Sequence, residues 1–142
     1  MREKARKSTT MLRVAYWMGI VLDAVSFVQM AIPSLGRAMM GSTLAIDPPY
    51  VFAIEMGAGL MLGWTVLLVW ADRRPVERRA VVPITMVVIA WSHATLQYGV
   101  RSGLLLMGRA LPQIILSAAL FAYFGVCATI SLMEDRARRA ST

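Results

Sequence analysis

Four stretches of the chain are almost entirely apolar, and short polar or turn-forming segments separate them. The stretches cover residues 14–32, 50–71, 80–98 and 111–133. Each is long enough to cross about 30 Å of hydrocarbon as a helix, because an α-helix rises about 1.5 Å per residue. The pattern therefore predicts an all-α membrane protein, a bundle of four transmembrane helices that forms a single domain over residues 1–142.

The segments between the stretches predict how the helices are connected. Residues 33–50, PSLGRAMMGSTLAIDPPY, are rich in turn formers and predict an irregular loop. The segment DRRPVERR, residues 72–79, is so short that the second and third spans are expected to be antiparallel neighbours. Residues 99–110, GVRSGLLLMGRA, include the apolar block 104–107. This block predicts either a loop that dips into the membrane interface or a cover over the bundle.

The distribution of charge predicts the orientation of the chain. Only 16% of the residues are charged, whereas a soluble domain has about 25%. Of the fifteen Lys and Arg residues, five lie in residues 1–13, four in residues 72–79 and three after residue 133. Because basic residues accumulate on the cytoplasmic side of a membrane protein, both termini are predicted to be cytoplasmic. The expected location is a cell membrane of the bacterial inner-membrane type, crossed several times.

The net charge of +7 predicts contact with anionic lipid head groups rather than with nucleic acid, because most of the cations abut apolar stretches. A cleaved signal peptide over residues 1–35 is not favoured. The apolar run is too long for one, it contains Asp23, and no cleavage site with small residues follows it.

The single cysteine, Cys127, excludes a disulfide, a redox pair and a thiolate metal cage within one chain. P-loop, kinase and dinucleotide-binding motifs do not occur. The sequence therefore predicts no cofactor and no metal site.

Polar side chains inside the apolar stretches are the candidate functional residues. At the helical rise they lie near the midplane or in the outer half of the membrane. A charged residue at the centre of a membrane helix costs about 2.5–3.5 kcal/mol, so such residues normally face other helices. We therefore expect them to line a polar, ligand-binding cavity that opens toward the outer face. They are Asp23, Gln29, Glu55, His93, Gln97 and Gln113.

Helical spacing places some of these residues on shared faces. Glu55, Gly59 and Gly63 follow one another at intervals of four residues, and the two glycines form a GxxxG pair that permits close helix packing. His93 and Gln97 share a face of the third span by the same rule. A structural interpretation stays open beside the cavity, in which Glu55 binds His93 or a glutamine and joins two helices.

Three functions are compatible with this pattern. The first is a membrane protein that binds a small amphipathic or lipophilic ligand in the polar cavity. The second is a structural or assembly subunit, which packs against a second copy of the chain or another membrane protein. The third is a small proton-coupled transporter. Enzymatic activity has weaker support and would be an acid–base isomerisation of a lipophilic substrate by Glu55 and His93.

Overall fold

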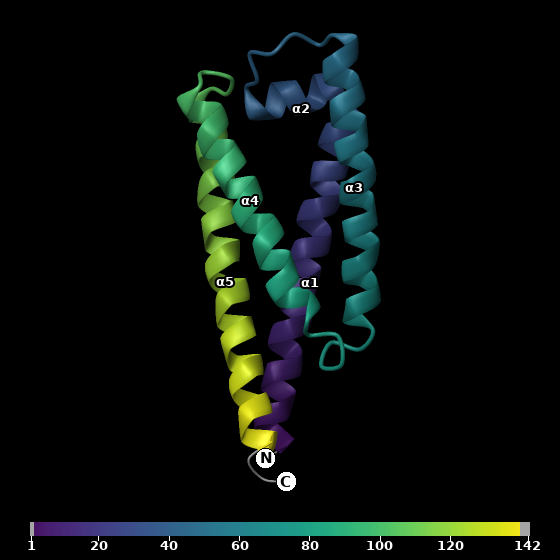
Figure 1. Cartoon of the computed structure of the whole chain (residues 1–142), viewed down its shortest axis with the longest axis vertical. Helices are drawn as coiled ribbons and strands as arrows, with labels where there is room; N and C mark the ends of the chain where they lie inside the picture. Colours follow the sequence, from purple (N-terminus) through teal and green to yellow (C-terminus); the bar gives the residue numbers. More distant parts are fainter. Residues whose placement is uncertain (1, 140–142) are drawn as a thin grey trace.

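The computed structural model describes the backbone of residues 2–139 and the side chains of residues 9–133. These residues form five α-helices and no β-strand, which confirms the all-helical prediction (Figure 1). The helices are α1 (Arg2–Ala31), α2 (Pro33–Met40), α3 (Pro48–Asp72), α4 (Val81–Arg101) and α5 (Met107–Arg139).

Four of the helices are long and apolar enough to cross a membrane, in agreement with the four predicted spans. Their candidate spans are Thr9–Ala31, Pro48–Asp72, Val81–Arg101 and Met107–Met133. Helices α1 and α5 continue beyond the apolar stretches into the basic segments. The side chains of the cations in residues 1–8 and 134–142, on which the predicted orientation partly depends, lie outside the described side chains.

Helix α2 was not expected, because its segment was predicted to be an irregular loop. Pro33 occupies the first turn of this helix, where its missing N–H costs nothing. Gly41 ends it in the left-handed conformation, with φ of 64°. Figure 1 shows α2 lying across one end of the molecule, at a steep angle to the long helices. We call this the α2 end, and the opposite end, where α1 begins and α5 ends, the terminal end.

The long helices pack as two antiparallel pairs, α1 with α3 and α4 with α5. Helices α3 and α4, the second and third spans, run antiparallel as expected (Figure 1), but each packs mainly on another helix, α3 on α1 and α4 on α5. Residues 73–80 form several turns between them, and this connection lets α3 and α4 separate and pack against other helices. A close fit holds α3 on α1: a Cβ atom on Gly19 would lie 2.7 Å from Cδ1 of the fully buried Leu68.

The hydrophobic core lies in the half of the molecule near the terminal end. Its largest fully buried side chains come from all four long helices, and they are Tyr16, Leu68, Val82 and Phe124. The hydroxyl of Tyr16 donates a hydrogen bond of 3.0 Å to the carbonyl of Arg78 in the connection between α3 and α4. The core thus joins the two helix pairs at this end.

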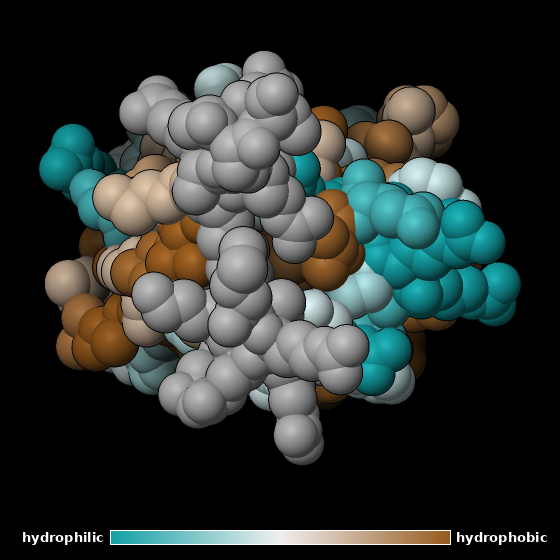
Figure 2. All heavy atoms as spheres, turned by 90° about the horizontal axis from the view of Figure 1, so that it is seen from below, coloured by the Kyte–Doolittle hydropathy of each residue, from teal (hydrophilic) through white to brown (hydrophobic). Residues whose placement is uncertain are grey.

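Polar side chains gather beside the apolar surface at the terminal end, on the side where α3 stops (Figure 2). The guanidinium of Arg78 lies over the ring of Trp70, 3.6 Å from its centroid, and also donates to the Trp70 carbonyl. Arg74 pairs with Glu77 at 3.2 Å, and both side chains are exposed. Such exposed pairs add little stability. The surface is chiefly a cluster of positive charge.

Two backbone hydrogen bonds connect the helix pairs at the α2 end. The N–H of Thr43 donates to the carbonyl of Leu104, and the N–H of Leu106 donates to the carbonyl of Gly41, both at 3.0 Å. Nη1 of Arg109 adds a bond of 2.6 Å to the carbonyl of Ala38 in α2. The apolar block 104–107 is therefore tied to the segment that follows α2.

Candidate functional site

A chain of hydrogen bonds centred on His93 runs along the interface between α4 and α5. Nδ1 of His93 lies 2.7 Å from Oγ of Ser117 on α5, and its Nε2 lies 2.7 Å from Nε2 of Gln97 one turn along α4. The other end of the Gln97 amide accepts a bond of 3.3 Å from Arg101. The Ser117 hydroxyl donates to the carbonyl of Ile114 at 2.9 Å.

The bond from Arg101 to Gln97 assigns donor and acceptor roles to the ring nitrogens of His93. The Gln97 oxygen accepts from Arg101, so its amino group is the donor toward Nε2 of His93. Nε2 is then an acceptor, and Nδ1 holds the proton that it donates to Ser117. Both ring nitrogens of His93 are thereby used by hydrogen bonds, Nδ1 to Ser117 on α5 and Nε2 to Gln97 on α4 itself, and neither is directed toward Glu55.

Glu55, unlike the half-buried His93, lies on an exposed face of its helix, α3. Its side chain points away from α1, the helix on which α3 packs, and its neighbours Met56 and Leu60 are 59% and 71% exposed. Gly59 and Gly63 share this face and are also exposed. A Cβ atom built on either glycine would meet nothing within 4 Å. The inward orientation expected for Glu55 and the two glycines is not found in the single chain.

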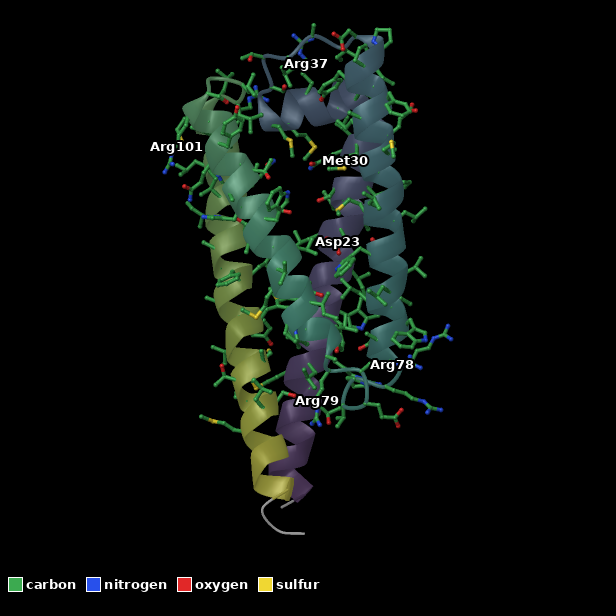
Figure 3. All side chains as sticks on the ribbon, in the orientation of Figure 1. Asp23, Met30, Arg37, Arg78, Arg79 and Arg101 are labelled. Carbon is green, nitrogen blue, oxygen red and sulfur yellow. The ribbon has the colours of Figure 1, made fainter. Side chains whose placement is uncertain are left out.

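Asp23 lies half-buried in the second half of α1 and is labelled in Figure 3. Two contacts give the register of α1 on α3: Leu68 packs on Gly19, and Met30 packs on Gly57. Both pairs are eleven residues apart on their own helices, which is about three turns. Asp23, four residues after Gly19, is therefore level with Trp64, four residues before Leu68. Nε1 of Trp64 is buried and has no hydrogen-bond partner among the described residues.

The remaining two candidates lie toward the α2 end. Gln29 is buried, with 8% of its surface exposed, where α2 crosses the end of α1. A Cβ atom on Gly36 of α2 would overlap the backbone carbonyl of Gln29, so the two helices approach closely at this point. Gln113 is half-buried on α5, one turn before Ser117.

The structure therefore does not bring the six candidates together in one site. His93 and Gln97 are in contact in the α4–α5 interface, Asp23 is near the α1–α3 interface, and Glu55 is on the outer surface of α3. No group of three or more His, Cys, Asp or Glu side chains that could hold a metal ion occurs among the described side chains. The ligand-binding role expected for the six residues stays a prediction.

Several structural residues were not found from the sequence. Gly19 and Gly36 permit close helix contacts, but an isolated glycine in an apolar run gives no sign of which helix approaches it. Trp64 is not among the predicted candidates, although it is level with Asp23 and its indole nitrogen is buried without a hydrogen-bond partner among the described residues. The matching depth of Asp23 and Trp64 in adjacent spans was a signal that could have linked them.

Comparison of the chain with protein-family models, curated proteins and solved structures finds no match. Function is therefore argued from the residues and their geometry.

Proposed function

We propose that this protein is an assembly subunit of a membrane complex, which binds a further transmembrane helix through the exposed face of α3. The observation that supports this proposal is the position of Glu55 beside Gly59 and Gly63 on an exposed face, where a Cβ atom on either glycine meets none of the described residues within 4 Å. In this proposal both termini and the basic α3–α4 connection face the cytoplasm, and the protein resides in the cell membrane.

The depth of Glu55 gives the face a physical reason to be covered. Glu55 is seven residues after Pro48, where the candidate span begins, which is about 10 Å along the helix. A carboxyl group at that depth faces acyl chains that offer no hydrogen bonds, and such residues almost always face protein or water. A partner helix with a donor at this level removes that cost.

The two glycines determine how closely the partner can approach. Glycines four residues apart leave a shallow strip along a helix, so that another backbone can come into direct contact. Gly59 and Gly63 leave such a strip one and two turns below Glu55. Close backbone packing at the glycines brings the carboxyl group within reach of a donor on the same partner.

The proposal is tested by the size of the protein after gentle extraction, measured by native mass spectrometry and blue-native electrophoresis. Wild-type protein is expected in a complex larger than one chain. The Gly59→Ile/Gly63→Ile variant should release the single chain, because it fills the strip at positions where an added Cβ atom meets nothing within 4 Å. Glu55→Leu should weaken the complex, and Glu55→Gln should retain more of it since an amide still forms hydrogen bonds.

Gly108→Ile is the matched control, because a Cβ atom there also meets nothing within 4 Å but lies on α5. It should leave the complex intact. A wild-type protein that is monomeric in the mildest extraction, or a double isoleucine variant that keeps its complex, contradicts the proposal. Disulfide formation by Gly59→Cys in a Cys127→Ala background identifies a second copy of the chain as the partner.

A further inference from the structure

The surface of α1 contains an apolar groove of about 500 Å³ that is separate from the α3 face. This volume is within the range of about 300–1,000 Å³ that is usual for small-molecule sites. Trp17 and Val21, on its walls, are 56% and 55% exposed, so the groove is open at the surface of the molecule. It is lined by Thr10, Arg13, Val14, Trp17, Met18, Val21 and Leu22.

The length of the groove matches one leaflet of a membrane. Residues 10 to 22 of α1 extend over about 18 Å at the helical rise. One half of a hydrocarbon core is about 15 Å thick. The groove begins near the terminal end of the span Thr9–Ala31 and stops near its middle. A single acyl chain that lies along α1 from the membrane surface inward therefore covers it.

The polar end of the groove is cationic. Arg13 is exposed, and its Nε lies 3.9 Å from Oδ1 of Asp72, a distance too long for a hydrogen bond. The terminal nitrogens of its guanidinium make no hydrogen bond or ion pair with another described side chain. Arg73, the residue after Asp72, is exposed as well. A guanidinium binds phosphate through two parallel hydrogen bonds, which suits a lipid head group.

We infer that this groove is a binding site for one anionic phospholipid of the leaflet at the terminal end. The phosphate binds Arg13, and an acyl chain lies against Val14, Trp17 and Val21. Polar and apolar walls occur in the order that a phospholipid requires, with the cation at the membrane surface and the apolar side chains below it. The site does not depend on the association proposed for α3.

Native mass spectrometry tests the inference with phosphatidylglycerol and phosphatidylcholine that have identical acyl chains. Wild-type protein is expected to retain one phosphatidylglycerol in preference to phosphatidylcholine. Arg13→Gln should lower phosphatidylglycerol retention about fivefold, the effect of one basic residue near an anionic surface, and leave phosphatidylcholine unchanged. Val21→Trp should lower retention of both lipids, because the larger ring fills the groove.

Each of the two groove variants, Arg13→Gln and Val21→Trp, has a matched control outside the groove. Arg37→Gln removes an exposed arginine at the α2 end and Val126→Trp enlarges an exposed apolar residue on α5, and both should retain lipid as the wild type does. Val21→Trp leaves the Arg13–Asp72 pair intact, so it decides the question if Arg13→Gln unfolds. Equal retention of the two lipids by the wild type overturns the inference. Retention unchanged by Val21→Trp, or reduced equally by Arg37→Gln and Arg13→Gln, also overturns it.

Discussion

The imidazole of His93 joins α4 to α5 through Nδ1, which lies 2.7 Å from Oγ of Ser117. Both side chains are half-buried within the candidate spans. In a membrane, a hydrogen bond between helices stabilises the pair because lipid offers no alternative partner, although measured values are modest. The bond explains why a histidine is tolerated at this depth without a charge partner.

A double-mutant cycle measures this bond. His93→Ala and Ser117→Ala should each lower the free energy of unfolding, and the pair should be coupled by about 0.6 kcal/mol, the mean for hydrogen bonds between membrane helices, and by no more than about 1.7 kcal/mol. Reversible unfolding in mixed detergent micelles gives the four values. Thr95→Ala is the control, because Thr95 bonds only to a carbonyl of its own helix. The changes in unfolding free energy caused by Thr95→Ala and His93→Ala should add. If the changes caused by Ser117→Ala and His93→Ala also add, the prediction is contradicted.

The predicted spans agree with the structure because they depend on the length of apolar runs, a property that the sequence contains directly. Which side of each helix packs against the rest of the chain is not contained in the length of an apolar run. Spacing shows that Glu55, Gly59 and Gly63 share a face, but not whether a helix of the same chain covers it. Depth and residue type predicted that these residues face inward. Their orientation depends on which helix packs against α3, and the sequence of one helix does not contain that information.

Helix α2 shows a second limit of the sequence pattern. Its eight residues form only about two turns, and Gly36 in the middle lowers the helix propensity. Pro33 at the start and Gly41 just beyond the end are nevertheless typical helix boundaries. The boundary residues indicated a helix, but the prediction of a loop followed the turn-forming composition of the whole segment instead.

Gly36→Ala should displace α2 from α1. The added methyl group would overlap the backbone carbonyl of Gln29, which cannot rotate away as a side chain can. Overpacking of this kind costs about 1–3 kcal/mol. Thermal unfolding in detergent, together with proteolysis of the 41–47 segment, measures the loss. Gly108→Ala is the matched control and should not destabilise the protein; equal behaviour of the two variants would show that α2 does not dock as described.

Tyr16→Phe should lower the free energy of unfolding by about 1 kcal/mol. The change removes the hydroxyl that donates to the carbonyl of Arg78 and leaves that buried bond unmade. The same substitution at Tyr98, which is 67% exposed, should have a much smaller effect. Comparison of the two unfolding midpoints checks the prediction. A Tyr16→Phe variant as stable as the wild type would mean that this hydrogen bond does not secure the α3–α4 connection.

The confinement of the core to one half of the molecule has a mechanical consequence. We expect rotation of one helix pair relative to the other to pivot where Tyr16 and Phe124 are packed, and at the α2 end to be opposed by hydrogen bonds such as that from Arg109 to the carbonyl of Ala38. Amide protons near the pivot should exchange with solvent only through the largest openings, and those around α2 through smaller ones. We therefore expect the α2 end to yield more to lateral pressure in its leaflet than the end that holds the core.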